Sequence, residues 1–184
     1  MTKSKIILIG FALVVTALVG GAYTALLLSD RTPQSAQPAL AEGAVARLYA
    51  STLNDANDKP TALAQWKGKT LVINFWAPWC PPCREEMPAF SRLQTKHAAN
   101  GVQFVGIALD SVDNVRNFSQ EHPATYPLLV GGEAGSELAS QLGNSQLALP
   151  YTLILAPNGD LRFTRLGRVS EQELDTLLQQ DAVR

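Results

Sequence analysis

Two cysteines, Cys80 and Cys83, carry the most distinctive chemistry in the sequence, within the segment WAPWCPPCREEMP at residues 76–88. They are the only cysteines among the 184 residues. A pair at this spacing can form a structural crosslink, supply half of a metal site or act as a reversible redox couple.

The residue pattern favours the redox couple over the other two possibilities. A crosslink across so short a loop removes little entropy from the unfolded chain, because that gain grows with loop length. A zinc site needs more ligands, and the two histidines, His97 and His122, are much further apart than the spacing of about three to five residues in zinc fingers. We therefore expect no metal site, and we assign both histidines to the surface without a role.

The expected elements around the pair give each cysteine its own chemistry. The run TLVINFW at residues 70–76 is typical of a buried strand, and Pro81 with the proline after it suits the first turn of a helix. Cys80 then lies at a helix N-terminus, where the helix dipole and free backbone N–H groups favour its thiolate. Cys83 lies about one helical turn further on, where it can attack a mixed disulfide formed at Cys80. We therefore expect Cys80 to be the attacking thiol and Cys83 the resolving thiol.

Strand and helix signals alternate along the rest of the chain, which predicts an α/β domain with a mixed sheet. Ser170 and Glu173 form a capping box for a last helix that runs to about residue 180. The other expected elements are a strand at 46–52, a helix from 81 to about 99, a strand at 102–109, a helix at 112–121, a strand at 126–130, a helix at 134–142 and a hairpin of residues 151–156 and 161–166.

The N-terminal part of the sequence predicts a membrane anchor. Ile6 to Leu28 is a run of 23 residues without a charge, which is long enough to cross a bilayer as a helix. The lysines before it place the N-terminus in the cytoplasm. A cleaved signal peptide is the alternative, because Ala39 to Ala41 offers a cleavage pattern, but the apolar run is longer than a signal peptide needs. We expect an anchor at 1–28, a flexible tether at 29–46 and a globular domain at 47–184.

The segment NFWAPWCPPCREEMP, with its lead-in KGKTLVINFWA, resembles the active site of the thioredoxin superfamily, and most closely its membrane-anchored TlpA-like/ResA-like branch. The resemblance covers the chain from about Leu48 to the C-terminus, and the anchor and tether agree with it. It implies a thioredoxin-like fold, with a central mixed sheet flanked by helices, behind an N-terminal transmembrane helix. It also implies a thiol:disulfide oxidoreductase that faces the bacterial periplasm from the inner membrane, with no cofactor besides a redox-active Cys80–Cys83 disulfide.

Further residues near the pair are assigned to substrate binding. Pro150 resembles the family's cis-proline, which lies opposite the cysteine pair and lines the substrate groove. Leu149, just before it, would present backbone groups to a bound peptide. Trp79 and Pro81 flank Cys80, and we expect Trp79 at the surface, where it shields the thiol and contacts substrates.

Glu86 has two interpretations. It resembles the acidic residue near the cysteine pair of ResA-like proteins, and it lies near enough to Cys83 to influence proton transfer from the resolving thiol. Alternatively, it is a solvated glutamate favoured by the helix dipole. Asn74 occupies the strand position where thioredoxin carries a buried carboxylate, and an asparagine cannot exchange a proton at ordinary pH. If a proton must be moved here, Glu86 is the remaining candidate.

The redox direction and the partners follow from the same residues. Pro81 and Pro82 lack the N–H groups that would solvate a Cys80 thiolate, which predicts a reductant. The resemblance implies disulfide-bearing exported proteins as substrates, for example apocytochrome c, and a transmembrane electron donor of the DsbD or CcdA type. The formal net charge of -1 and the pI near 6.1 indicate no nucleic-acid partner.

Two other functions are alternatives for a chain with these thiols. A copper-binding assembly module could use both cysteines, although relatives of that type space them as CxxxC and add a late histidine, and no histidine follows His122. A peroxide-reducing enzyme of the peroxiredoxin type needs a cysteine in a pocket with threonine and arginine. Here the cysteines form a CxxC at an expected helix start instead.

Overall fold

The computed structural model describes residues 40–181. The expected anchor and the tether up to Ala39 lie outside the described residues. Within residues 40–181, none of the helices combines the length and the apolar composition that a membrane span requires.

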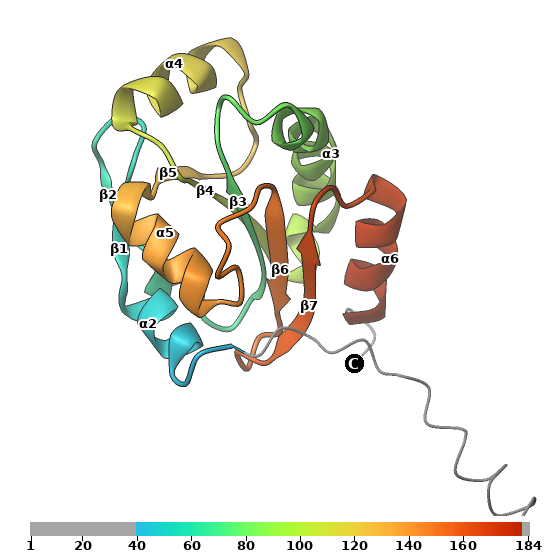
Figure 1. Ribbon diagram of the computed structural model, residues 1–184. Coiled ribbons are helices and arrows are strands. Elements are labelled where there is room, and N and C mark those ends of the chain that lie inside the picture. The colour runs from blue at the N-terminus through green and yellow to red at the C-terminus, as the bar shows by residue number, and fades with distance from the viewer. Residues whose placement is uncertain (1–39, 182–184) are drawn as a thin grey trace, which may run out of the picture. The chain divides into compact units, whose positions relative to one another are not determined.

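A seven-stranded mixed sheet in the order β2-β1-β5-β4-β3-β6-β7 forms the centre of the described chain (Figure 1). β3 is an interior strand, parallel to β4 and antiparallel to β6. The strands are β1 Thr52–Asp55, β2 Pro60–Ala62, β3 Thr70–Trp76, β4 Val102–Ala108, β5 Leu128–Val130, β6 Tyr151–Leu155 and β7 Leu161–Leu166.

Helices cover both faces of the sheet, so that α3 and α6 lie on one side and α2 and α5 on the other (Figure 1). This double cover explains why all seven residues of β3 are buried and why all of them except Thr70 and Asn74 are apolar. The helices are α2 Ala44–Ala50, α3 Pro81–His97, α4 Val112–Glu121, α5 Gly132–Gln141 and α6 Glu171–Asp181, with short 3-10 turns at Leu63–Trp66 and Ala98–Asn100.

Most of the expected elements are confirmed, but the strand predicted at 46–52 is wrong. The chain there forms helix α2 and only then enters β1. Ala44, Leu48 and Tyr49 are buried, and their spacing places them on one helical face against the core between the sheet and α5. The residues 44–46, expected in the tether, are therefore the first turn of a packed helix.

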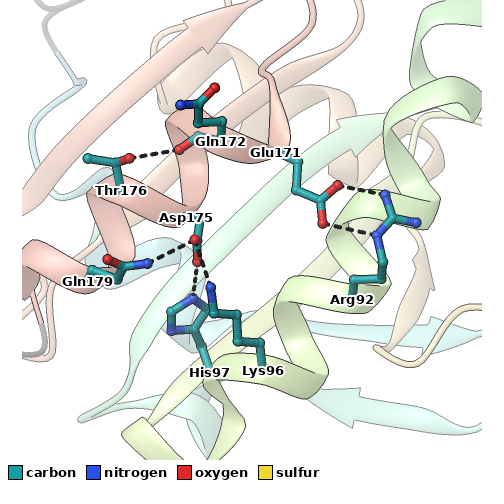
Figure 2. Close-up of polar contacts among 8 residues, drawn as sticks. All are labelled: Arg92, Lys96, His97, Glu171, Gln172, Asp175, Thr176 and Gln179. Carbon is teal, nitrogen blue, oxygen red and sulfur yellow. Dashed lines mark hydrogen bonds and ion pairs between the residues drawn. The ribbon is translucent and has the colours of Figure 1, made fainter.

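Polar contacts join α3 to α6 along the faces that these two helices turn toward each other (Figure 2). Arg92 forms a two-pronged ion pair with Glu171, at 2.6 and 3.0 Å. Lys96 Nζ lies 2.8 Å from one oxygen of Asp175, and His97 Nε2 lies 2.7 Å from the other. The hydrogen bonds from Lys96 and then His97 lower the pKa of Asp175 to about 2.

The prediction that His97 lies on the surface is therefore wrong. Its side chain is only 3% exposed, because it ends α3 on the side that packs against α6. Sequence reasoning could not see this contact, since Asp175 comes from the far end of the chain. His122 is exposed, as predicted, and its ring stacks on Phe118 at 4.5 Å between centroids.

Candidate active site

Cys80 and Cys83 form a disulfide at the start of α3. Cys80 is the N-cap residue of this helix, and the next two positions are prolines, which have no N–H to offer. The first free backbone N–H is that of Cys83, which donates to Cys80 Sγ at 3.3 Å. A thiolate on Cys80 would keep this single backbone donor, together with the positive end of the helix dipole.

The two cysteines differ slightly in their exposure to solvent. Cys80 retains a small exposed area, at 3%, whereas Cys83 has none. Trp79 is 68% exposed beside Cys80, and Pro81 on its other side is also exposed. An incoming disulfide therefore meets Cys80 first, between two exposed apolar side chains, while Cys83 stays behind it in the core.

The Leu149–Pro150 peptide bond is cis, as the resemblance implied. Because β3 and β6 are antiparallel and Phe75 pairs with Tyr151, Pro150 lies level with Trp76, at the sheet edge where the chain turns into α3. Leu149 is half-buried and packs against the core cluster that contains both cysteines. The structure thus brings the proline loop and the disulfide to the same edge of the sheet.

Asn144 holds the loop that precedes Pro150, and sequence reasoning missed it. Its buried side chain donates to the carbonyl of Ala148 at 2.9 Å and accepts from the N–H of Ala148 at 3.1 Å. An asparagine directly after a glycine is a turn signal, and that signal alone marked the position. A second hydrogen bond holds the proline itself, since the N–H of Gly167 donates to the carbonyl of Pro150 at 2.8 Å.

Glu86 is buried, with 2% of its surface exposed, so the interpretation as a solvated glutamate is wrong. Asn74 Nδ2 donates to one carboxyl oxygen at 2.9 Å, and the backbone N–H of Val169 donates to the other at 3.3 Å. Asn74 Nδ2 also donates to Thr152 Oγ1 at 3.0 Å. The carboxyl group is therefore fixed from both sides, by β3 and by the segment before α6.

Burial raises the pKa of Glu86 to about 7, against the opposing effects of the Val169 and Asn74 hydrogen bonds and of the Arg168 charge. A carboxyl group with this pKa exchanges protons readily near neutral pH. Cys83 lies one turn before Glu86 on the same buried face of α3. This places a proton acceptor within the same helix as the expected resolving thiol.

The comparisons with known proteins agree with this arrangement. The sequence model of the AhpC/TSA family matches residues 46–164, which include both cysteines, Glu86 and Pro150. The chain belongs to the AhpC/TSA family. The family match thus covers most of the described residues, from α2 into β7.

Relatives of this AhpC/TSA family member carry names from redox chemistry. The thioredoxin-like protein YneN of Bacillus subtilis (strain 168) is 29% identical over 134 residues, which are 71% of this chain and 75% of that protein. The thiol-disulfide oxidoreductase ResA of Bacillus thuringiensis subsp. konkukian (strain 97-27) is 28% identical over 127 residues, with coverage of 68% and 71%.

Solved structures lead to the same fold. A thioredoxin-related protein from Neisseria meningitidis serogroup B has a TM-score of 0.64 and 32% identity, and the match covers 73% of this chain and 100% of that one. A thiol:disulfide interchange protein of the thioredoxin family from Chlorobium tepidum TLS has a TM-score of 0.64 and 25% identity, with coverage of 80% and 99%. The predictions of a thioredoxin-like fold and of a thiol:disulfide oxidoreductase are confirmed at this level.

The raised pKa of Glu86 predicts a dependence of stability on pH. Between about 4.5, the ordinary value, and about 7, the folded protein holds a proton that the unfolded chain has released. Protonated Glu86 therefore stabilises the folded protein fully below pH 4.5. This stabilisation, about 3 kcal/mol in the free energy of unfolding, is lost as the pH rises through about 7. Urea unfolding of the oxidised protein and of Glu86→Gln from pH 4 to 8 measures it. Parallel curves for the two proteins would contradict the burial of an ionisable Glu86.

Proposed function

We propose that the protein reduces disulfides of exported proteins on the periplasmic side of the inner membrane, held there by its N-terminal anchor. The observation that carries this proposal is the placement of the cysteine pair. Cys80, with 3% of its surface exposed, lies between the exposed residues Trp79 and Pro81, and Cys83 is fully buried on the helix face that also carries Glu86. This arrangement suits a dithiol in which one sulfur meets a protein substrate and the other completes the exchange.

The reaction proceeds in two exchanges. The Cys80 thiolate attacks one sulfur of the substrate disulfide, so that a mixed disulfide forms and the other substrate sulfur leaves as a thiolate. Cys83 then gives its proton to Glu86, and its thiolate attacks Cys80 Sγ, which releases the second substrate thiolate. The substrate gains two electrons, and the Cys80–Cys83 disulfide forms with the loss of the same two.

The direction of electron flow depends on how strongly the reduced form is stabilised. Because Pro81 and Pro82 have no N–H, the Cys80 thiolate keeps one backbone donor, that of Cys83. Weak stabilisation of the thiolate favours a reductant over a disulfide donor.

We expect a reduction potential clearly below the ~-120 mV of a strongly oxidising disulfide donor. Equilibration of the purified domain with glutathione or dithiothreitol buffers, followed by quantification of the two redox forms, measures this potential. A value near ~-120 mV would contradict the proposed direction.

The proposed partners follow from the location and the direction. A reductant outside the cytoplasm must be reduced again, and a transmembrane donor of the DsbD or CcdA type would supply the electrons. Candidate substrates are exported thiol proteins, including apocytochrome c. The uncharged run at residues 6–28 supports the location, and the relatives named ResA support the reaction.

The copper-binding alternative has less support. A copper site on the two thiols gains from a third ligand, and in residues 40–181 no three side chains of His, Cys, Asp or Glu lie together as a metal site requires. Copper titration of the reduced protein, with Cys80→Ser as the control, separates this function from disulfide exchange.

A further inference from the structure

Three buried polar atoms near the active site have no hydrogen-bond partner among residues 40–181. They are Asn74 Oδ1, Trp76 Nε1 and the hydroxyl of Tyr126. Each of these side chains is at least nine-tenths buried. A buried polar group without a partner is costly, so native proteins satisfy such groups with other residues or with an ordered internal water.

Asn74 and Trp76 lie on β3, Tyr126 lies just before β5, and all three are placed by contacts around Gly106 on β4. Asn74 on β3 pairs with Gly106 on β4 in the parallel register. A Cβ atom at Gly106 would lie 3.0 Å from Trp76 Nε1, so the indole lies directly over this glycine. Gly106 N–H donates to the carbonyl of Pro127, the residue after Tyr126. These contacts bring Asn74, Trp76 and the segment of Tyr126 together beside Gly106, and Trp76 and Tyr126 belong to the same core cluster on the α3 face of the sheet.

Glu86 borders the same spot. Asn74 uses its amide nitrogen to donate to Glu86, which leaves its Oδ1 as the free acceptor. The charge of Glu86 also reaches Tyr126, because burial and then this charge raise the pKa of the Tyr126 phenol. The Tyr126 phenol therefore stays protonated at neutral pH, where it can donate a hydrogen bond toward a charged Glu86.

We propose that Asn74, Trp76 and Tyr126 hold one internal water molecule beside Glu86, and that Tyr126 is a positioning residue that stabilises the Glu86 carboxylate through this water. The donors and acceptors match. The Trp76 indole N–H and the Tyr126 phenol both donate to the water. The water donates one hydrogen to the Asn74 amide oxygen and the other to Glu86. The importance of this water for catalysis rests on the proposed role of Glu86, but its effect on the Glu86 proton does not.

Two other ionisable residues lie near Glu86 and remain in place when Tyr126 is changed. Cys83, one turn earlier on α3, is held in the disulfide of the oxidised protein, and Arg168 lies in the segment before α6. Arg168 pairs with Glu85 at 2.6 Å, and its charge lowers the pKa of Glu86. A change at Tyr126 leaves this pair untouched, so any effect on Glu86 comes from the hydroxyl.

Tyr126→Phe tests the proposal because it removes only the hydroxyl. Protein with 13C-labelled glutamate carboxyl groups is titrated in the oxidised form by NMR, and Glu86→Gln identifies the Glu86 signal. We expect the midpoint of the Glu86 titration to rise by about one pH unit, the equivalent of one lost hydrogen bond to a charged group. The resolving step of the reduced enzyme should show the same shift in its pH profile.

Tyr49→Phe is the matched control. The hydroxyl of Tyr49 is also buried without a partner among the described residues, but it lies in the core on the opposite face of the sheet. This variant should leave the Glu86 midpoint unchanged. An unchanged midpoint in Tyr126→Phe, or an equal shift in both variants, would overturn the proposal.

A crystal structure of the wild-type oxidised protein gives a second measurement that needs no variant. We expect one ordered water within hydrogen-bond distance of all three atoms, and dry contacts there would overturn the proposal. Neither measurement needs turnover of a substrate. If the oxidised protein passes both but reduces no exported protein, the proposed function fails and the water site stands.

Discussion

Cys83→Ala is expected to stop turnover and to leave substrates covalently attached to Cys80. The variant keeps the attacking thiol of Cys80 with its helix-start environment, so the first exchange still forms the mixed disulfide. It removes the only other cysteine in the chain, so the second exchange has no nucleophile. We expect the rate of catalytic disulfide reduction to fall by roughly a thousandfold or more.

The measurement is made in two parts, with an internal control. Insulin or another disulfide protein gives the turnover rate, and non-reducing gels of the native membrane reveal mixed disulfides with partners. Cys80→Ala should lose turnover to the same extent but form no mixed disulfides, because the remaining cysteine, Cys83, is fully buried. If Cys83→Ala accumulates no mixed disulfide while Cys80 still reacts with a thiol reagent, the two-exchange mechanism is wrong.

Glu86→Gln is expected to slow the resolving step by about a hundredfold near neutral pH, the lower range for loss of a general base. The base form is the carboxylate, so the wild-type rate should rise through pH 7 and fall about tenfold for each unit below it. The glutamine cannot accept the Cys83 proton, so its rate should lose this inflection. Stopped-flow measurement of release from a preformed mixed disulfide, from pH 5 to 9, isolates the step.

Glu85→Gln is the matched control for that experiment. Glu85 is the neighbouring residue on α3, but it is exposed and pairs with Arg168 at the surface. Its removal should shift the inflection only slightly, through the change around Arg168. An unaltered inflection in Glu86→Gln would assign the proton transfer to another group.

Local sequence signals predicted the parts of the site that depend on neighbours in the chain. A buried strand followed by two prolines was enough to place Cys80 at a helix start and Cys83 in the first turn. Trp79 was expected at the surface from the adjacent turn, and it is. The position of Pro150 came from the resemblance, since nothing in the residues around it specifies a cis bond.

Tertiary contacts decided the parts that the sequence left open or predicted incorrectly. Glu86 lies near a helix start, which left a solvated glutamate possible, but the fold buries it beside Val169, a residue far along the chain that donates to it. His97 was assigned to the surface for the same reason, since its partner Asp175 belongs to the last helix. α2 was read as a strand because a short apolar segment such as LYA does not distinguish the two periodicities.

The Asn74 side chain donates both of its amide hydrogens in hydrogen bonds, and this has a further consequence. One binds Glu86 on α3, and the other binds Thr152, two residues after Pro150 on β6. Asn74 thus connects Glu86 to the strand that follows Pro150. Residues 167–169 make a second connection between Glu86 and Pro150, since the N–H of Gly167 donates to the Pro150 carbonyl and the N–H of Val169 donates to Glu86. Two binding events joined in this way obey reciprocity. By whatever factor a bound substrate shifts the proton affinity of Glu86, protonation of Glu86 shifts the affinity for that substrate.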